Sequence, residues 1–250
     1  MLGCIIQARM SSSRLPGKVM LPLKNKKPIL FHVIKQLQYS KLIKKIVVAT
    51  SLNSEDDIIE DYLEEIGIDC FRGSLDDLID RHYQCAKKFN FSAIMRMPSD
   101  KPFFDPQIVD EVIELFNSVP NDYTSNFPVP LKFNIGTEVE IFSFEALEKA
   151  WKNSVKPSER EHIFPYFHNH KNEFKILYSP NLEKFSNYRF VVDRDNDYKL
   201  VKLLADKINK SPILISDIVN LLEKEPELKK INEHIDFNEG QSKSIKEENN

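Results

Sequence analysis

The chain has 250 residues, of which 41% are hydrophobic and 29% charged, a composition typical of a soluble globular domain with its own core. Its formal net charge of −3 provides no overall basic field that would favour nucleic acid or a membrane surface as a partner. The cysteines Cys4, Cys70 and Cys85 are odd in number and far apart, which excludes a disulfide framework and CxxC zinc or redox sites. We therefore expect a reduced, cytoplasmic protein, and the short apolar run at the N-terminus predicts neither a signal peptide nor a membrane span.

Short apolar runs alternate with longer segments of helical periodicity in the first two thirds of the chain, a pattern typical of βα units around a mostly parallel sheet. Strands are predicted over residues 4–8, 46–50, 68–71 and 93–97. A helix is predicted after each of them, beginning at Pro28, Ser54, Asp76 and Asp105. The helix that begins at Ser54 has an acidic first turn, which suits the positive end of a helix dipole.

The pattern changes at Pro120. Prolines and aromatic residues predict an irregular insertion over residues 120–142 that shapes an acceptor pocket or a dimer contact, with a strand over 137–142 at its end. The remaining predictions are helices over 144–151, 198–208 and 216–223 and strands over 174–178 and 188–192. We expect one domain over residues 1–235 and, because residues 236–250 are polar without an apolar period, a disordered tail after it.

Two familiar nucleotide-binding motifs are absent from the sequence. None of the six glycines lies close enough to another to form GxGxxG, the dinucleotide-binding pattern. A P-loop reading of Gly17-Lys18 fails because Ser12 occupies the position of the first glycine and Val19 follows the lysine. Any phosphate must therefore be bound in another way.

The loop after the first predicted strand is a candidate anion site. It carries three cations and three adjacent hydroxyl groups, which belong to Arg9, Arg14, Lys18, Ser11, Ser12 and Ser13. The C-terminal ends of strands face the ligand crevice in open α/β sheets, and arginine and lysine complement phosphate. Composition alone leaves a solvated polar loop as an equally good interpretation.

Two aspartates follow predicted strands and are expected to meet at the same edge of the sheet. Asp100 follows the strand over 93–97, and Asp193 follows the strand over 188–192. Such a pair suits Mg²⁺, although a helix cap or a turn is the commoner role for a single loop aspartate. The DxDxD run at 193–197 is no EF-hand, because Tyr198 and Leu204 replace the required glycine and glutamate.

A series of sequence blocks resembles the cytidylyltransferase-type family named for spore coat polysaccharide biosynthesis protein SpsF, which is related to CMP-3-deoxy-manno-octulosonate synthetase. The blocks span roughly residues 3–230 and read IIQARMSSSRLPGKVMLPL, KIVVATS, FRGSLDDLIDRHYQCAK, MRMPSDKPFFDP, GTEVEIFSFEALEKAW, EREHIFPY and RFVVDRDNDY. The resemblance implies an α/β nucleotidyltransferase fold of the glycosyltransferase-A-like type and a homodimer. It also implies Mg²⁺-dependent transfer of CMP from CTP to an acidic sugar or a small phosphate or phosphonate acceptor.

The same resemblance assigns roles to individual residues. Asp100 and Asp193 would hold the metal, and Arg14 and Lys18 would act with them in catalysis. The nucleotide would be bound by Gln7, Ala8, Arg9, Ser12, Arg14, Lys18, Arg72, Asp77, Pro98 and Ser99. The acceptor would be bound by Lys101, Glu138, Glu140, His162 and Arg189. Helix capping is an equally good interpretation of Asp77, and a structural role is the commoner one for a single histidine.

Lys101 departs from the family pattern. Relatives read like TGDCP or SDCP around the metal aspartate, whereas residues 98–102 here read PSDKP. The Lys101 ammonium would either pair with Asp100 or reach an anionic acceptor, and we favour the acceptor because Mg²⁺ would already occupy Asp100. Two other functions stay open: a glycosyltransferase that uses a DxD metal site, and a nucleotide-binding protein without catalytic activity.

Overall fold

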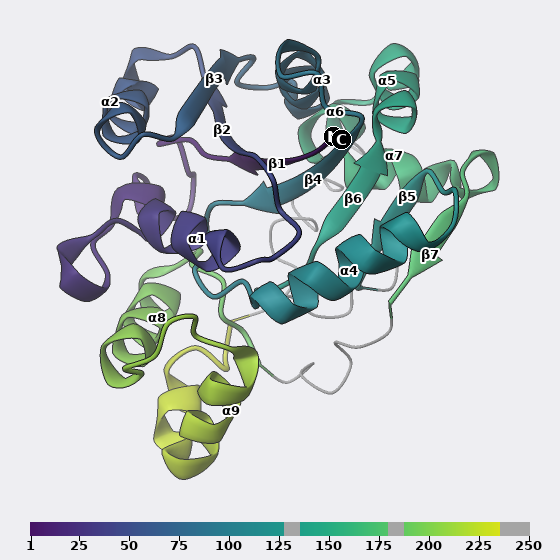
Figure 1. Ribbon diagram of the computed structural model, residues 1–250. Coiled ribbons are helices and arrows are strands. Elements are labelled where there is room, and N and C mark those ends of the chain that lie inside the picture. Colours follow the sequence, from purple (N-terminus) through teal and green to yellow (C-terminus); the bar gives the residue numbers. More distant parts are fainter. Residues whose placement is uncertain (128–135, 180–187, 236–250) are drawn as a thin grey trace.

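The computed structural model describes residues 1–127, 136–179 and 188–235. Seven strands form one sheet in the order β3-β2-β1-β4-β6-β5-β7. Their bounds are β1 Leu2–Gln7, β2 Ile46–Ser51, β3 Asp69–Gly73, β4 Ala93–Pro98, β5 Tyr123–Ser125, β6 Glu140–Ser143 and β7 Ile176–Tyr178. β3, β2, β1 and β4 are parallel neighbours, β6 is antiparallel to both β4 and β5, and β7 is parallel to β5. The sheet is thus mostly parallel, as predicted (Figure 1).

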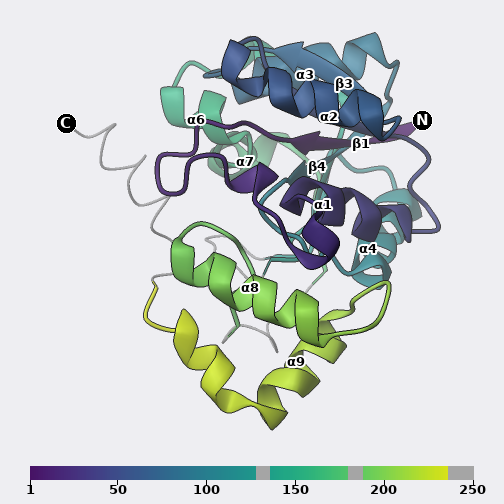
Figure 2. The same cartoon turned by 90° about the vertical axis from the view of Figure 1, so that its left-hand side faces the viewer.

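Helices cover both faces of the sheet (Figures 1 and 2). One apolar cluster joins one face to α1, α2 and α4, and it continues into α8 and α9; a second cluster joins the other face to α3, α5 and α7. The helices are α1 Ile29–Gln38, α2 Asp57–Glu65, α3 Leu78–Lys88, α4 Pro106–Ser118, α5 Phe144–Asn153, α6 Pro157–His162, α7 Phe164–Asn169, α8 Asp195–Lys207 and α9 Ile215–Lys224. Short 3₁₀ turns cover Lys18–Met20, Lys24–Lys26, Ser54–Asp56, Lys171–Glu173 and Pro226–Ile231.

The sequence explains why the central strand β1 is buried and where three of the helices begin. Ile5 and Ile6 in β1 are fully buried, as expected for a parallel strand that is covered on both faces. The side chains of Asp77, Asp105 and Ser143 accept hydrogen bonds from backbone N–H groups in the first turns of α3, α4 and α5, which satisfies donors that a helix start leaves unpaired.

A buried amide joins the C-terminal helices to the rest of the molecule. The Gln36 side chain in α1 donates from Nε2 to the carbonyl oxygens of Phe104 and Ile213, at 3.0 and 2.6 Å, and its Oε1 accepts from the Ile213 N–H at 3.0 Å. The group is 6% exposed and makes three hydrogen bonds, so it holds the chain just before α9 in one place.

The strand predicted over residues 188–192 is not part of the sheet. Phe190, Val191 and Val192 are buried, which accounts for the apolar run, but the Val192 N–H donates to the carbonyl of Asp100 in the loop after β4, at 2.8 Å. The run therefore packs in the core as extended chain. Because its hydrogen bond goes to that loop, it still brings Asp193 to the end of β4.

The described part of residues 120–142 contains one strand that was not predicted, β5, and the start of the predicted strand β6. Both strands pair within the sheet, and β6 begins at Glu140 instead of residue 137. Residues 128–135, in the middle of the predicted insertion, and the predicted tail over 236–250 lie outside the described residues.

Two further elements were not predicted. α6 and α7 have six residues each and are separated by Ile163, which has a φ of 44°, so neither is long enough to show helical periodicity. The predicted helices and most of the predicted strands agree with the structure to within a few residues. No described helix combines the length and the apolar character that crossing a bilayer requires.

Candidate active site

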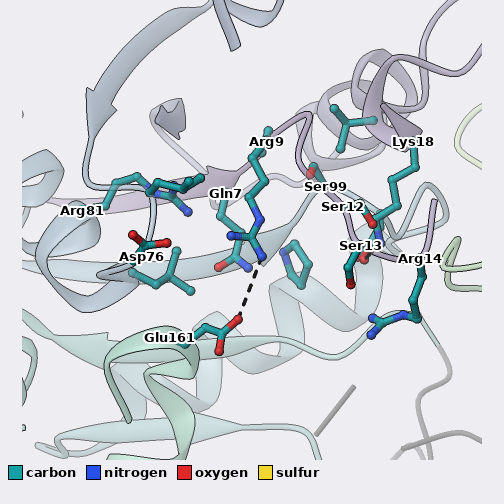
Figure 3. Close-up of a pocket in the computed structure, with 16 residues that line it drawn as sticks. Gln7, Arg9, Ser12, Ser13, Arg14, Lys18, Asp76, Arg81, Ser99 and Glu161 are labelled. Carbon is teal, nitrogen blue, oxygen red and sulfur yellow. Dashed lines mark hydrogen bonds and ion pairs between the residues drawn. The ribbon is translucent and has the colours of Figure 1, made fainter. Parts of the chain in front are cut away.

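A cavity of about 280 Å³ lies at the C-terminal ends of β1 and β4. The loop after β1, the loop after β4, the start of α3 and Glu161 in α6 form its wall (Figure 3). Eight of the residues predicted to bind nucleotide line it: Gln7, Ala8, Arg9, Ser12, Arg14, Lys18, Pro98 and Ser99. The position agrees with the rule that open α/β sheets bind ligands beyond the carboxyl ends of their strands.

Backbone hydrogen bonds fix the loop after β1. The Met10 carbonyl accepts from the N–H groups of Ser12 and Gly17, both at 2.8 Å, so the loop folds back on its own start. Gly17 has a φ of 70°, a conformation that glycine adopts without steric cost, and it directs the chain into the turn that carries Lys18. The Met10 N–H donates to the fully buried Asp56 side chain at 2.7 Å, which ties the loop to the end of β2.

A cluster of opposite charges lies at one end of the cavity. The Lys18 ammonium lies 2.6 Å from a carboxylate oxygen of Asp100 and 2.6 Å from one of Asp193. The Arg14 guanidinium donates to the other oxygen of Asp193 at 3.0 Å. The structure therefore brings together the two predicted metal ligands and two of the predicted phosphate-binding cations, and it pairs them with one another.

This pairing sets the charge states of the cluster. Burial alone would raise the pKa of Asp193, but the charges of Lys18 and Arg14 outweigh burial and lower that pKa to about 2. Burial alone would lower the pKa of Lys18, but Asp100 and Asp193 raise it above its usual value. Both groups are therefore charged at neutral pH.

Asp100 keeps one oxygen without a partner. Its Oδ1 is buried and accepts no hydrogen bond from the described residues, although a buried carboxylate oxygen is normally satisfied. The loop that carries it is fixed by two backbone hydrogen bonds, from Ser99 to the carbonyl of Gln7 at 3.2 Å and from Val192 to the carbonyl of Asp100. The oxygen is thus held in a fixed position without a hydrogen-bond partner among the described residues.

Asp197 holds Asp193 in place, a role that sequence reasoning missed. Its fully buried carboxylate accepts from the Arg189 guanidinium at 2.9 and 3.0 Å. It also accepts from the N–H groups of Asp193 and Arg194, both at 3.1 Å, and from Asn232 at 2.9 Å. An aspartate three residues into a helix is a common capping signal, but its pairing with Arg189 depends on the fold.

Lys101 does not pair with Asp100, which was one of the two arrangements that the sequence suggested. Its buried ammonium donates to Glu138 at 2.7 Å, and Glu138 also accepts from the Gly136 N–H at 3.0 and 3.2 Å. Neither residue lines the cavity. The backbone after β4 turns the Lys101 side chain away from Asp100 into a buried ion pair.

Two of the other predicted acceptor-binding residues, Glu140 and Arg189, are engaged in the interior. Glu140 pairs with Arg96 and accepts from the Tyr123 hydroxyl, and Arg189 pairs with Asp197. Neither Glu140 nor Arg189 lines the cavity. His162 is the last residue of α6, and its side chain lies outside the described part of the structure.

Arg72 and Asp77 are engaged with other charged residues, although Asp77 lies between Asp76 and Leu78, which line the cavity. Arg72 pairs with Asp57 and Glu60 of α2. It also donates to the carbonyl oxygens of Ser51 and Asn53, at the end of β2 and just after it. Asp77 caps α3 and pairs with Arg160 at 3.1 Å, so the capping interpretation is correct for it. Neither residue lines the cavity.

Three further charged residues, Asp76, Arg81 and Glu161, also line the cavity wall. Arg81 in α3 is 3% exposed, and burial lowers the pKa of its guanidinium to about 10. Glu161 lies 4.0 Å from Arg9 across the cavity (Figure 3). The FRGSLDDLIDR and EREHIFPY blocks contain these residues, but helical periodicity does not show which of their charged positions face a ligand.

Replacement of Asp197 by alanine is expected to reduce stability strongly. The change leaves the buried Arg189 without its main partner, and breaking a buried ion pair in this way costs about 3 kcal/mol or more. The free energy of unfolding, measured by denaturant titration, should fall by that amount. Asp195→Ala is the matched control, because Asp195 belongs to the same DxDxD run but is exposed; it should change stability by about 0.5 kcal/mol or less. Equal losses would contradict the anchoring role of Asp197.

Acid should remove the stability that Asp193 contributes. Because the folded state lowers the pKa of Asp193 from 3.8 to about 2, its contribution is complete above pH 4 and is lost as the pH falls towards 2. A shift of this size corresponds to about 2 kcal/mol. In unfolding titrations between pH 5 and 2, the stability of Asp193→Asn should depend less on pH than that of the wild type. Parallel curves for the two proteins would show that Asp193 is not held as a paired carboxylate.

Comparison with known proteins identifies the family. The cytidylyltransferase family model matches residues 3–238. Spore coat polysaccharide biosynthesis protein SpsF of Bacillus subtilis is 32% identical over 234 residues, which cover 89% of this chain and 94% of the relative. The 8-amino-3,8-dideoxy-manno-octulosonate cytidylyltransferase of Shewanella sediminis is 31% identical over 209 residues, 80% of this chain and 71% of the relative.

A solved structure agrees with these matches. The structure of a cytidylyltransferase from Leptospira borgpetersenii superposes with a TM-score of 0.85 at 34% identity, and the match covers 91% of this chain and 95% of that one. The resemblance inferred from the ordered sequence blocks and the nucleotidyltransferase fold are both confirmed. The chain belongs to the cytidylyltransferase family.

Proposed function

We propose that this protein transfers CMP from CTP to an acidic sugar, with release of pyrophosphate, in the biosynthesis of a surface glycan. The observation that carries the proposal is the charge cluster of Lys18, Arg14, Asp100 and Asp193 at the end of the cavity. The family supports CTP as the donor, and the named substrate of the Shewanella relative supports an acidic sugar as the acceptor. A small phosphate or phosphonate is the alternative acceptor class.

The residues of the cluster fit Mg²⁺ as a cofactor. Two carboxylates meet there, the buried Oδ1 of Asp100 has no partner among the described residues, and Mg²⁺ is bound in proteins by one or two carboxylates together with substrate phosphate oxygens. Asp100 and Asp193 would hold the ion. When bound, it would neutralise phosphate charge and favour attack on phosphorus.

The chain's own cations supply the remaining electrostatic stabilisation. Lys18 and Arg14 compensate the carboxylates when no ligand is bound, and a triphosphate gives them new anionic partners at the same place. They would then stabilise the charge that develops on the departing pyrophosphate as an acceptor oxygen attacks the α-phosphorus. Because this chemistry depends on charge and position, it requires no nucleophilic side chain.

Two observations weigh against the alternative functions. In the DxDxD run, Asp195 is exposed and Asp197 is fully occupied by Arg189, Asn232 and backbone N–H groups, so the run does not form the compact DxD metal site of a glycosyltransferase. A protein without catalytic activity was suggested because Lys101 replaces the usual residue beside Asp100. In the structure Lys101 pairs with Glu138, and the Oδ1 atom of Asp100 has no partner among the described residues.

A homodimer in the cytoplasm stays a prediction from the family resemblance. Size-exclusion chromatography with light scattering measures the oligomeric state directly.

The activity itself is tested by a pyrophosphate-release assay with four nucleoside triphosphates, Mg²⁺, and panels of acidic sugars, sugar phosphates and phosphonates. Release that depends on both CTP and an acidic sugar supports the proposal, whereas release of a nucleoside diphosphate from a nucleotide sugar would support a glycosyltransferase.

Removal of either carboxylate charge should abolish turnover. Asp100→Asn and Asp193→Asn keep the size of the side chain but remove a negative metal ligand, so pyrophosphate release should fall to background in each. Asp195→Asn should retain normal turnover, since Asp195 is exposed and lies outside the cavity. Near wild-type rates in either Asp100→Asn or Asp193→Asn at ordinary Mg²⁺ concentrations would exclude the two-carboxylate site.

Alanine at Arg14 or Lys18 should lower the turnover number by roughly one to three powers of ten, the cost of losing a preorganised contact to a transition state. Affinity for CTP should fall as well. Arg72→Ala is the control, because Arg72 is a strand arginine with two carboxylate partners outside the cavity. Thermal unfolding of each variant separates lost chemistry from lost structure. Unchanged rate and affinity in both cavity variants would indicate that the loop is solvated surface.

A further inference from the structure

The orientation of the Gln7 side-chain amide is determined by a neighbouring arginine. Gln7 lines the cavity at the end of β1, and its Oε1 accepts from Arg96 Nε at 2.8 Å. A guanidinium only donates hydrogen bonds, so the amide oxygen must face Arg96. The amide nitrogen, with its two N–H donors, is left for the cavity.

Arg96 is itself held by a chain of contacts across four neighbouring strands. Its other guanidinium nitrogen pairs with Glu140, which lies directly opposite it in the register of β4 and β6. Glu140 in turn accepts from the Tyr123 hydroxyl of β5 at 3.0 Å. The side chains of Arg96 and Glu140 are 13% and 5% exposed, and a buried, satisfied network of this kind resists rearrangement. Reversal of the Gln7 amide would place N–H groups against the guanidinium.

The position of Gln7 in the cavity points to the part of the substrate that it meets. Figure 3 shows Arg14 and Lys18 at one end of the cavity, Arg81 and Asp76 at the other, and Gln7 between them. A nucleotide with its phosphates on the Arg14 and Lys18 end extends its nucleoside over Gln7 towards Arg81. That end also has the apolar side chains of Leu75 and Leu78 in its wall, as a base requires.

The Arg81 guanidinium is a second donor group at this end, and its Nη1 donates to the carbonyl of Ser74 at 3.1 Å. Arg81 is 3% exposed, and its Nε makes no hydrogen bond to the described residues. A buried donor of this kind is costly unless a ligand satisfies it. The nucleoside end therefore presents two fixed groups that require hydrogen-bond acceptors, with the exposed carboxylate of Asp76 beside them.

We propose that Gln7, oriented by Arg96, is a base-specificity residue that donates an amide N–H to the acceptor atom N3 of cytosine. Uracil carries a hydrogen on N3, which would oppose the amide N–H groups, so the arrangement selects CTP over UTP. Arg96 is a positioning residue in this account, since it acts on the base through Gln7. The inference rests on the proposed use of CTP and adds the residue that recognises its base.

The test is equilibrium binding of CTP and UTP, by calorimetry, to the wild type and to Gln7→Glu and Gln7→Met. Gln7→Glu offers lone pairs where the amide offered N–H groups, and Gln7→Met offers neither. Both should lower CTP affinity about tenfold, the value of one hydrogen bond, and Gln7→Glu should retain or improve UTP affinity. The ratio of CTP to UTP affinity should therefore fall in both variants. An unchanged ratio in both would overturn the proposal.

Arg96→Lys tests the positioning step, with Arg72→Lys as a matched strand arginine outside the cavity. Lysine keeps the charge beside Glu140 but lacks the planar fork that contacts two partners at once, so the ratio should fall for Arg96→Lys and stay at the wild-type value for Arg72→Lys. If Arg96→Lys does not fold, the two Gln7 variants still test the proposal. Gln7 is only half-buried, so its replacement should leave the fold intact. A wild type that binds neither nucleotide would contradict the proposed function itself, whereas CTP binding with an unchanged ratio contradicts only the role of Gln7.

Discussion

The ion pairs that Lys18 makes with Asp100 and Asp193 are the interaction on which the rest of the site depends. Two carboxylates that close together repel each other, and partial burial strengthens the repulsion. A cation between them makes the arrangement stable without a ligand. Lys18 reaches this position because Gly17 turns the chain and the Met10 carbonyl closes the loop, so one backbone conformation determines where the charges meet.

In the function proposed above, charge compensation of this kind also prepares the site for a triphosphate. Cations that already lie at the cavity need no movement of backbone to meet phosphate oxygens, and preorganised charges of this kind stabilise a transition state more than mobile ones. Two largely buried residues outside the cavity also contribute to this preorganisation. Asp197 fixes the backbone before α8, and Arg96 fixes the Gln7 amide, although neither residue lines the cavity.

Much of the fold could be predicted from periodicity, and the site could be predicted where it follows from strand ends. Asp100 follows β4 directly, so its position at the sheet edge follows from the pattern alone. Asp193 was placed there for a partly wrong reason, because residues 188–192 are buried extended chain and not a strand. Apolar alternation reports burial, and both arrangements bury the same side chains.

The directions of charged side chains could not be predicted in the same way. Lys101, Glu140 and Arg189 have the composition of an acceptor site, but each has a partner from a distant part of the chain. Arg72 pairs with two acidic residues of α2. Ion pairs between segments depend on how the segments pack. The spacing of residues along the sequence does not show that packing.

The three hydrogen bonds of Gln36 have a consequence for the order in which the protein is assembled. They hold the chain that precedes α9 against α1 and α4, and Asp193 lies on the segment that leads into the α8 and α9 pair. During synthesis, the loop after β1 and the loop after β4 emerge long before this segment does. Contacts of such large sequence separation form late. A nascent chain therefore has Lys18 and Asp100 but lacks the second carboxylate until α8 and α9 have docked, so the complete charge cluster forms only after that step.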